Sequence, residues 1–174
     1  GRTDEEWAEV MSWCRSALSD SAVEVREVAL GALLKRGDEE GRAQLMNLLS
    51  GTVDERGLAA RAMRGALEGR PEVASQARAI LQARWAQEVA GSKRGVELTS
   101  TLQTLGGVPG RETGEFLLEA AEVLGDEQIR GVTGFRWCVG QAFNAGEEAR
   151  VVLRERLAVE TDPIRRLDLI QFLW

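Results

Sequence analysis

The sequence contains no histidine and no tyrosine, and only three prolines and two cysteines occur among its 174 residues. Without histidine, the chain lacks the side chain that most often serves as a general base and as a zinc ligand. The two cysteines, Cys14 and Cys138, lie far apart within apolar helical patterns, so we expect two buried thiols rather than a disulfide or a zinc site. We therefore predict that the protein holds no metal and no cofactor.

Long apolar runs are also absent. No stretch approaches the roughly 20 residues that a helix needs to span a bilayer, and the chain opens with no signal-peptide pattern. We expect no membrane association and a cytoplasmic location. Because the sequence begins with Gly1 and ends on the apolar helix 169–174, we expect either an excerpt of a longer protein or a Trp174 that docks on the preceding helix or on a partner.

Basic residues are fewer than acidic ones, 22 against 28, which gives a formal net charge of −6. Proteins that bind nucleic acid usually present a basic field, so this balance disfavours a nucleic-acid partner. The acidic clusters lie at predicted helix N-termini, where the helix dipole favours negative charge. They therefore need no metal ion to explain them.

The residues that are abundant favour helices, since Ala, Leu, Glu and Arg are good helix formers. Apolar residues recur at three- and four-residue spacing, and three segments open with a capping box, namely Thr3–Glu6, Ser21–Glu24 and Thr52–Glu55. A further helix is predicted to open at Asp126 and to run through Val132 to Val139, and the glycine-rich stretch 106–110 is predicted to be a loop. In total we predict about ten helices and no strands, an all-α fold.

A repeat becomes visible when the second helix of each predicted hairpin is aligned on its early basic residue. The aligned residues, at intervals of 30 to 38 positions, are Arg26, Arg56, Arg94, Arg130 and Arg165. An apolar residue stands two places after each of them. Such a period is typical of a solenoid, in which each hairpin buries its apolar face against its neighbours. We predict a single domain over 1–174 with five hairpins, approximately 1–37, 38–70, 71–109, 110–145 and 146–174.

Two segments, 25–33 (VREVALGAL) and 162–165 (DPIR), resemble the second helix of HEAT repeats. The short spacing is similar to that of the HEAT-like repeats of phycobilisome lyase-type proteins, with armadillo-like or irregular α-solenoids as the alternatives. Repeats three and four depart from the pattern, because Glu97 and Thr133 occupy the place of its usual Ala. The resemblance implies an α-solenoid whose second helices line the concave side.

The resemblance also implies a structural role for the five aligned arginines. In HEAT repeats such an arginine pairs with an aspartate near the turn between the helices, and four aspartates lie close to them here, namely Asp20, Asp54, Asp126 and Asp162. We therefore expect an arginine ladder that stabilises the array. The alternative is a phosphate-binding stripe, which the neighbouring carboxylates would neutralise.

Catalytic signatures are missing from the sequence. It has no Gly-x-Ser-x-Gly elbow and no Walker loop, and the stretch 106–110 lacks the Lys-Ser/Thr that holds phosphates. The HEAT resemblance implies one enzymatic alternative, the alkylation-repeat DNA glycosylases, which use aromatic residues and a carboxylate on the concave face. In this sequence Gln141, not Asp, stands one turn after Trp137. We therefore predict a non-enzymatic protein, with nucleic-acid binding or DNA repair as the alternative.

The predicted function is protein–protein interaction, as a scaffold module that binds its partner on the concave face. Helical arrays offer an extended concave surface, and Arg and Trp are favoured at binding hot spots. Lys35, Arg61 and Arg64 form a candidate basic patch for an acidic peptide, against the alternative of a solvated helix face. Phe135 and Trp137 are candidates for a binding groove or for the core.

Overall fold

The computed structural model describes residues 3–91, 96–125 and 127–174. These residues form an all-α protein with ten helices: α1 (Asp4–Ala17), α2 (Val23–Arg36), α3 (Glu39–Ser50), α4 (Val53–Met63), α5 (Pro71–Ala90), α6 (Val96–Leu105), α7 (Arg111–Leu124), α8 (Gly134–Asn144), α9 (Glu147–Val159) and α10 (Pro163–Leu173). One short antiparallel hairpin, β1 (Gln128–Ile129) and β2 (Val132–Thr133), precedes α8. Among the described helices, none is long and apolar enough to cross a membrane.

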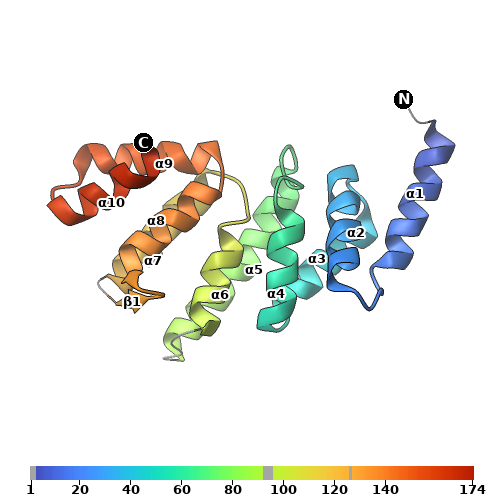
Figure 1. The fold of residues 1–174 in the computed structure, drawn as a ribbon, viewed down its shortest axis with the longest axis horizontal. Helices are drawn as coiled ribbons and strands as arrows, with labels where there is room; N and C mark the ends of the chain where they lie inside the picture. Colours follow the sequence, from blue (N-terminus) through green and yellow to red (C-terminus); the bar gives the residue numbers. More distant parts are fainter. Residues whose placement is uncertain (1–2, 92–95, 126) are drawn as a thin grey trace.

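The helices follow one another in chain order along the long axis of the molecule (Figure 1). Helices α2, α4, α6, α8 and α10 contact one another in series and form one layer. Behind them, α3 packs against α5, and α7 packs against α9. Each helix from α2 to α10 thus packs against helices one and two places away in the chain, an order of contacts that is compatible with the predicted solenoid.

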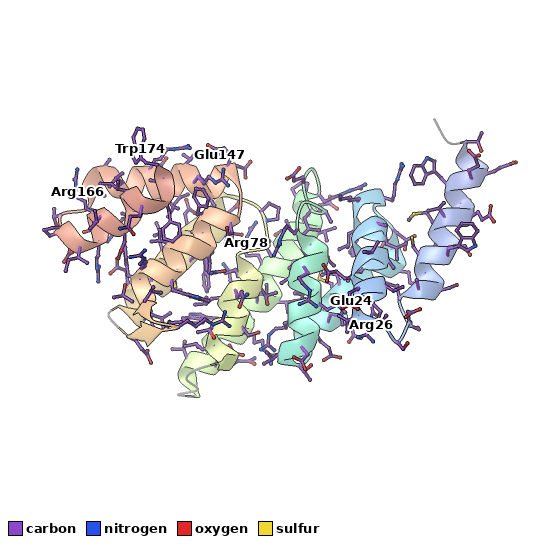
Figure 2. All side chains as sticks on the ribbon, viewed as in Figure 1. Glu24, Arg26, Arg78, Glu147, Arg166 and Trp174 are labelled. Atoms are coloured by element: carbon purple, nitrogen blue, oxygen red, sulfur yellow. The ribbon has the colours of Figure 1, made fainter. Side chains whose placement is uncertain are left out.

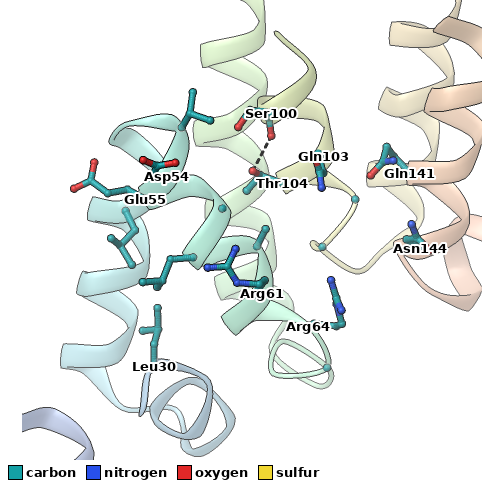
Figure 3. A pocket seen from close by; sticks show the side chains of 18 of the residues that line it. Leu30, Asp54, Glu55, Arg61, Arg64, Ser100, Gln103, Thr104, Gln141 and Asn144 are labelled. Carbon is teal, nitrogen blue, oxygen red and sulfur yellow. Dashed lines mark hydrogen bonds between the residues drawn. The ribbon is translucent and has the colours of Figure 1, made fainter. Parts of the chain in front are cut away.

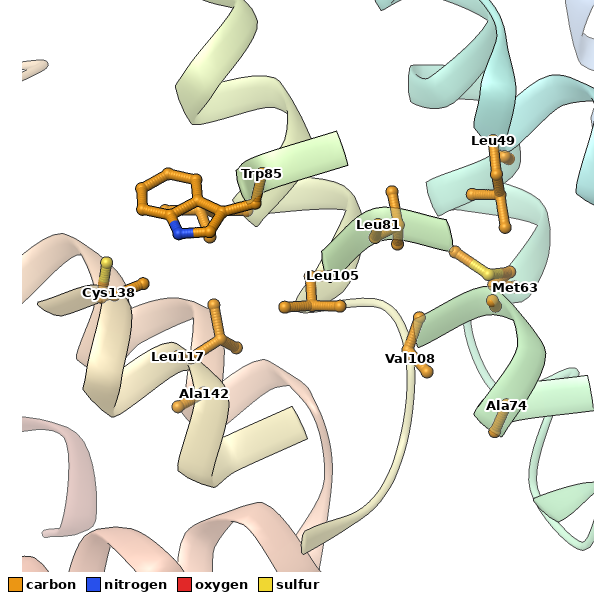
Figure 4. Packing of buried hydrophobic residues seen from close by; sticks show 14 of the residues in the cluster. Leu49, Met63, Ala74, Leu81, Trp85, Leu105, Val108, Leu117, Cys138 and Ala142 are labelled. Carbon is orange, nitrogen blue, oxygen red and sulfur yellow. The ribbon is translucent and has the colours of Figure 1, made fainter. Parts of the chain in front are cut away.

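The core is a continuous cluster of leucine and alanine side chains with two buried tryptophans. Figure 4 shows its middle part, where Trp85 of α5 and Leu105 at the end of α6 lie near Leu117 of α7 and Cys138 of α8. Burial raises the pKa of the Cys138 thiol to about 12, so this thiol stays protonated at neutral pH. Cys14 is also a free thiol but is only half-buried, so the prediction of two buried thiols is confirmed for Cys138 alone.

Arginine side chains join neighbouring hairpins through hydrogen bonds that span 34 or 35 residues. The six pairs are Arg42–Gln76, Arg61–Glu27, Arg70–Lys35, Arg78–Thr113, Arg84–Ser50 and Arg156–Glu122, with the backbone carbonyl as acceptor at Lys35 and Ser50. An array of hairpins with a period near 35 residues produces such a constant separation. These six bonds are compatible with the predicted repeat, although other long-range arginine bonds span 23, 43 or 44 residues.

Most predicted helix starts agree with the structure. The capping boxes at Thr3 and Thr52 form, and the Thr52 N–H donates to Glu55 Oε2 at 2.6 Å. The box predicted at Ser21 and Glu24 is wrong: α2 begins after Ala22. The reason is that the carboxylate of Asp20, two residues upstream, accepts the Ala22 N–H at 2.7 Å and forms the turn itself.

The prediction of a helix from Asp126 is also wrong, whereas the prediction of an all-α fold is confirmed, since the described residues contain only one pair of two-residue strands. Asp126 lies outside the described residues, and the residues after it form the β1–β2 hairpin, with Ile129 opposite Val132. Arg130 and Gly131 form its turn with φ of 50° and 84°. β-branched residues favour extended backbone, and glycine permits the tight turn, so α8 begins only at Gly134.

The last helix leaves its terminal side chain in solvent. Trp174 is 98% exposed and points away from the molecule (Figure 2). The prediction that Trp174 docks on the preceding helix is therefore wrong.

The apolar position two places after each aligned arginine is not a common core position either, because Leu58 is buried whereas Val28 and Leu167 are exposed.

Candidate binding groove

One large groove of about 1230 Å³ crosses the layer of second helices. We call it the α2–α8 groove, because α2, α4, α6 and α8 contribute most of its lining. Its lining includes Arg26 and Leu30 of α2, Leu48 of α3, Asp54, Glu55, Leu58 and Arg61 of α4, Arg64 and Glu68 after α4, Ser100, Gln103 and Thr104 of α6, Arg130 of the hairpin turn, and Gln141 and Asn144 of α8.

The two ends of the groove differ in chemistry. Leucines from α2, α3 and α4 line the end near α2, whereas the end near α8 carries the amides of Gln103, Gln141 and Asn144. Figure 3 shows Arg61 and Arg64 between these two ends. A primary amide both donates and accepts hydrogen bonds, as a peptide backbone does. The amide end therefore suits an extended polypeptide as well as a polar side chain.

The glycine-rich loop 106–110 forms part of the groove wall. A Cβ at Gly106 would lie 3.0 Å from the backbone oxygen of Gln141, and one at Gly107 would lie 3.2 Å from the backbone oxygen of Ala60. Glycine at position 106 therefore allows the end of α6 to approach α8, and glycine at position 107 allows it to approach α4. The prediction of a loop here is confirmed, since helix α6 ends at Leu105 and α7 begins at Arg111.

The charge of the groove differs from that of the whole chain. Four arginines and three carboxylates line it, whereas the chain carries a net charge of −6. Two of these charged groups are already engaged. Arg61 Nε donates to Glu27 Oε2 at 2.7 Å, and the Glu55 carboxylate accepts bonds from Thr52, which hold the pKa of Glu55 below its usual range.

The candidate partner-binding residues separate into two groups. Arg61 and Arg64 line the groove, as the basic patch requires, but Lys35 is exposed on α2 outside the lining. Phe135 and Trp137 are 1% and 8% exposed, so of the two alternatives, a binding groove or the core, both residues take the core. Their apolar faces are used in packing α8 against its neighbours.

The five aligned arginines do not share one environment. Arg26 and Arg130 line the groove, Arg94 lies outside the described residues, and Arg56 is 0% exposed, with Nη1 donating to the Gly51 carbonyl at 2.8 Å. Arg165 pairs with Glu122 at 2.7 Å and lies over the Phe135 ring.

The aspartates that were expected to pair with these arginines also have other roles. Asp20 accepts the Ala22 N–H, and Asp162 accepts the backbone N–H groups of residues 164 and 165. The ion pair of Arg165 is therefore made with Glu122 of α7 and not with the aspartate at its own helix start. An ordered ladder of Asp–Arg pairs is thus not the common feature of these positions.

Catalytic and metal-binding constellations are not evident in the part of the chain that the structure describes. No cluster of three or more metal-ligating side chains occurs there. Among the described residues that line the groove there is no aromatic side chain, so it lacks the aromatic–carboxylate arrangement that the glycosylase alternative requires. The Thr104 hydroxyl donates to the Ser100 carbonyl at 2.8 Å (Figure 3), a bond internal to α6.

Several groove residues were not identified from the sequence. Gln141 and Asn144 stand three residues apart on α8, which places them on one helix face, but nothing in their spacing distinguishes them from other surface amides. Gln103 joins them only because α6 packs against α8. A comparison of the chain with protein-family models and with curated protein sequences found no match.

Proposed function

We propose that the protein is a non-enzymatic interaction module of the HEAT-like kind, which holds an extended segment of a partner protein in the α2–α8 groove. The observation that carries this proposal is the groove itself. It crosses four consecutive second helices and combines leucines, amides and arginines. Its volume of about 1230 Å³ exceeds the roughly 300–1,000 Å³ of ordinary small-molecule sites.

The nature of the lining favours a polypeptide over a nucleic acid. Single-stranded nucleic acids are held mainly by stacking on aromatic side chains and by a strongly basic channel. The described lining offers no aromatic side chain, and three carboxylates accompany its four arginines.

We place the module in the cytoplasm, because Cys14 and Cys138 are both free thiols, as is usual in a reducing compartment.

The test is a selection of random 12-residue peptides displayed on phage against the immobilised protein. Gln103→Trp fills the groove without changing charge, because Gln103 is exposed and lines it. Gln87→Trp is the matched control, on the exposed surface of α5 outside the groove. We expect peptides that bind the wild type and the Gln87→Trp variant but lose at least about tenfold in affinity for Gln103→Trp, equivalent to about 1.4 kcal/mol.

Two outcomes would overturn the proposal. One is a set of peptides that bind the Gln103→Trp variant as tightly as the wild type, since the groove would then not be the binding surface. The other is the recovery of no binding peptide from a diverse library. Both variants should unfold at the wild-type temperature, because neither substitution touches a buried side chain.

A further inference from the structure

The arginines of the groove indicate the chemistry of its occupant. Resting on the proposed function, we propose that the segment held in the α2–α8 groove is acidic, and that Arg26, Arg64 and Arg130 receive its carboxylates. These three come from α2, from the end of α4 and from the β1–β2 turn, so they surround the groove rather than form one local cluster.

The strongest observation is a contrast between these three arginines and all the others. Every other described arginine contacts a protein group: a carboxylate, a backbone carbonyl, a side-chain oxygen or an aromatic ring. Within the described residues, the side chains of Arg26, Arg64 and Arg130 make no hydrogen bond, ion pair or ring contact. All three line the groove. The chain as a whole has more acidic than basic residues. Guanidinium groups that line one groove without pairing with a carboxylate of the protein are therefore complementary to an anionic group of a binding partner.

The surroundings of Arg64 favour a carboxylate within a peptide over a compact isolated anion. Arg64 lines the same groove as Gln103 and Asn144, whose amides can bond the backbone beside an acidic side chain. Asp54 and Glu68, near the two ends of α4, would repel a continuous run of acidic residues. We therefore expect carboxylates that are spaced along the segment.

The experiment uses fluorescein-labelled synthetic copies of the peptides recovered by the phage selection, measured by fluorescence anisotropy. The proposal predicts that these peptides are enriched in Asp and Glu, and that replacing their acidic residues by amides weakens binding. Arg64→Gln is expected to cost up to about fivefold in affinity, and Arg64→Glu about tenfold or more. Lys35→Glu is the control: it reverses an equally exposed charge outside the groove, and we expect less than a twofold change.

The outcomes separate this inference from the function on which it rests. Groove-dependent peptides that are neutral or basic, or that bind Arg64→Glu as tightly as the wild type, would overturn the acidic occupant and leave the interaction module standing. Failure to find any groove-dependent peptide would remove both. A labelled 12-nucleotide single-stranded DNA that binds more tightly than every peptide, and is lost in Gln103→Trp and Arg64→Glu, would instead assign the arginines to nucleic acid.

Discussion

Helices α4 and α8 both line the groove, but their N-terminal regions differ. Helix α4 starts directly from the capping box of Thr52 and Glu55, and its arginine, Arg56, lies one turn inside the helix. Helix α8 starts from Thr133, the last residue of a β-hairpin, and the arginine aligned with Arg56 lies before the helix in the hairpin turn.

This difference reverses the role of the two arginines. Arg56 is completely buried and donates to the Gly51 carbonyl, whereas Arg130 is exposed in the left-handed region with φ of 50°. In sequence the two positions look alike, each followed two places later by an apolar residue. The environment of such a residue depends on where the helix begins, and a later start moves it from the core to the surface of the groove.

The largest effect that we predict concerns Arg56. Replacement by Ala removes the bond to Gly51 and leaves an unfilled volume in the core, so we expect a loss of about 3 kcal/mol in the free energy of unfolding. Arg56→Met restores most of the volume and should lose less than Arg56→Ala. Arg130→Gln should change stability by no more than about 0.5 kcal/mol, because that side chain is exposed. Urea unfolding followed by circular dichroism measures all three, and equal losses at Arg56 and Arg130 would contradict the comparison.

A smaller effect distinguishes the two helix caps by their dependence on pH. Bonds from the Thr52 N–H and hydroxyl lower the pKa of Glu55 in the folded protein. A lowered carboxyl pKa stabilises the fold fully above the unfolded value near 4.3, and this contribution is lost as the pH falls through the folded value. Glu55→Gln should therefore be destabilising at pH 7, and its difference from the wild type should disappear toward pH 3.

The cap of α8 provides the contrast. The Thr133 hydroxyl accepts the Arg136 N–H at 3.3 Å, and arginine stands where α4 has Glu55. Thr133→Ala should cost about 1 kcal/mol, and this difference from the wild type should be the same at pH 7 and pH 3. A cost at Thr133 that disappears in acid, or a cost at Glu55 that persists there, would show that the two caps do not differ in this way.

The parts of the fold that could be predicted from the sequence are those that depend on contacts between residues no more than four positions apart in the chain. The predicted caps that form, at Thr3 and Thr52, depend on a side chain and a backbone N–H that lie three residues apart. The β1–β2 hairpin depends instead on the pairing of two extended segments and on a turn with positive φ, and helical periodicity does not report either feature.

Among the residues of the groove, only those whose exposure depends on the face of a single helix could be predicted from the sequence. Arg61 lies on the face of α4 that turns away from its buried side chains, so its place in the groove follows from helical spacing, whereas Arg64 lies one residue past the end of α4. Phe135 and Trp137 could not be assigned, because aromatic side chains in a core and in a groove have the same periodicity. The amides of Gln103 and Asn144 come together through the packing of α6 against α8, which no local pattern encodes.

The smallest effect that we predict is a gain in stability at the hairpin turn. Arg130 and Gly131 both have positive φ, as a two-residue turn of type I′ requires, and Asn followed by Gly is the favoured pair in such turns. Arg130→Asn should therefore increase the free energy of unfolding by about 0.5 kcal/mol, because Asn tolerates the left-handed region better than Arg does. Gly131→Ala, at φ of 84°, is the control and should reduce stability.

If Arg130 is retained for an anionic partner, the same Arg130→Asn variant should bind the acidic peptides more weakly while unfolding at a higher temperature, since strained residues persist where function needs them. A variant that loses stability would show that the turn holds Arg130 without strain, and one that gains stability but binds the peptides as tightly as the wild type would show that Arg130 does not contribute to the groove.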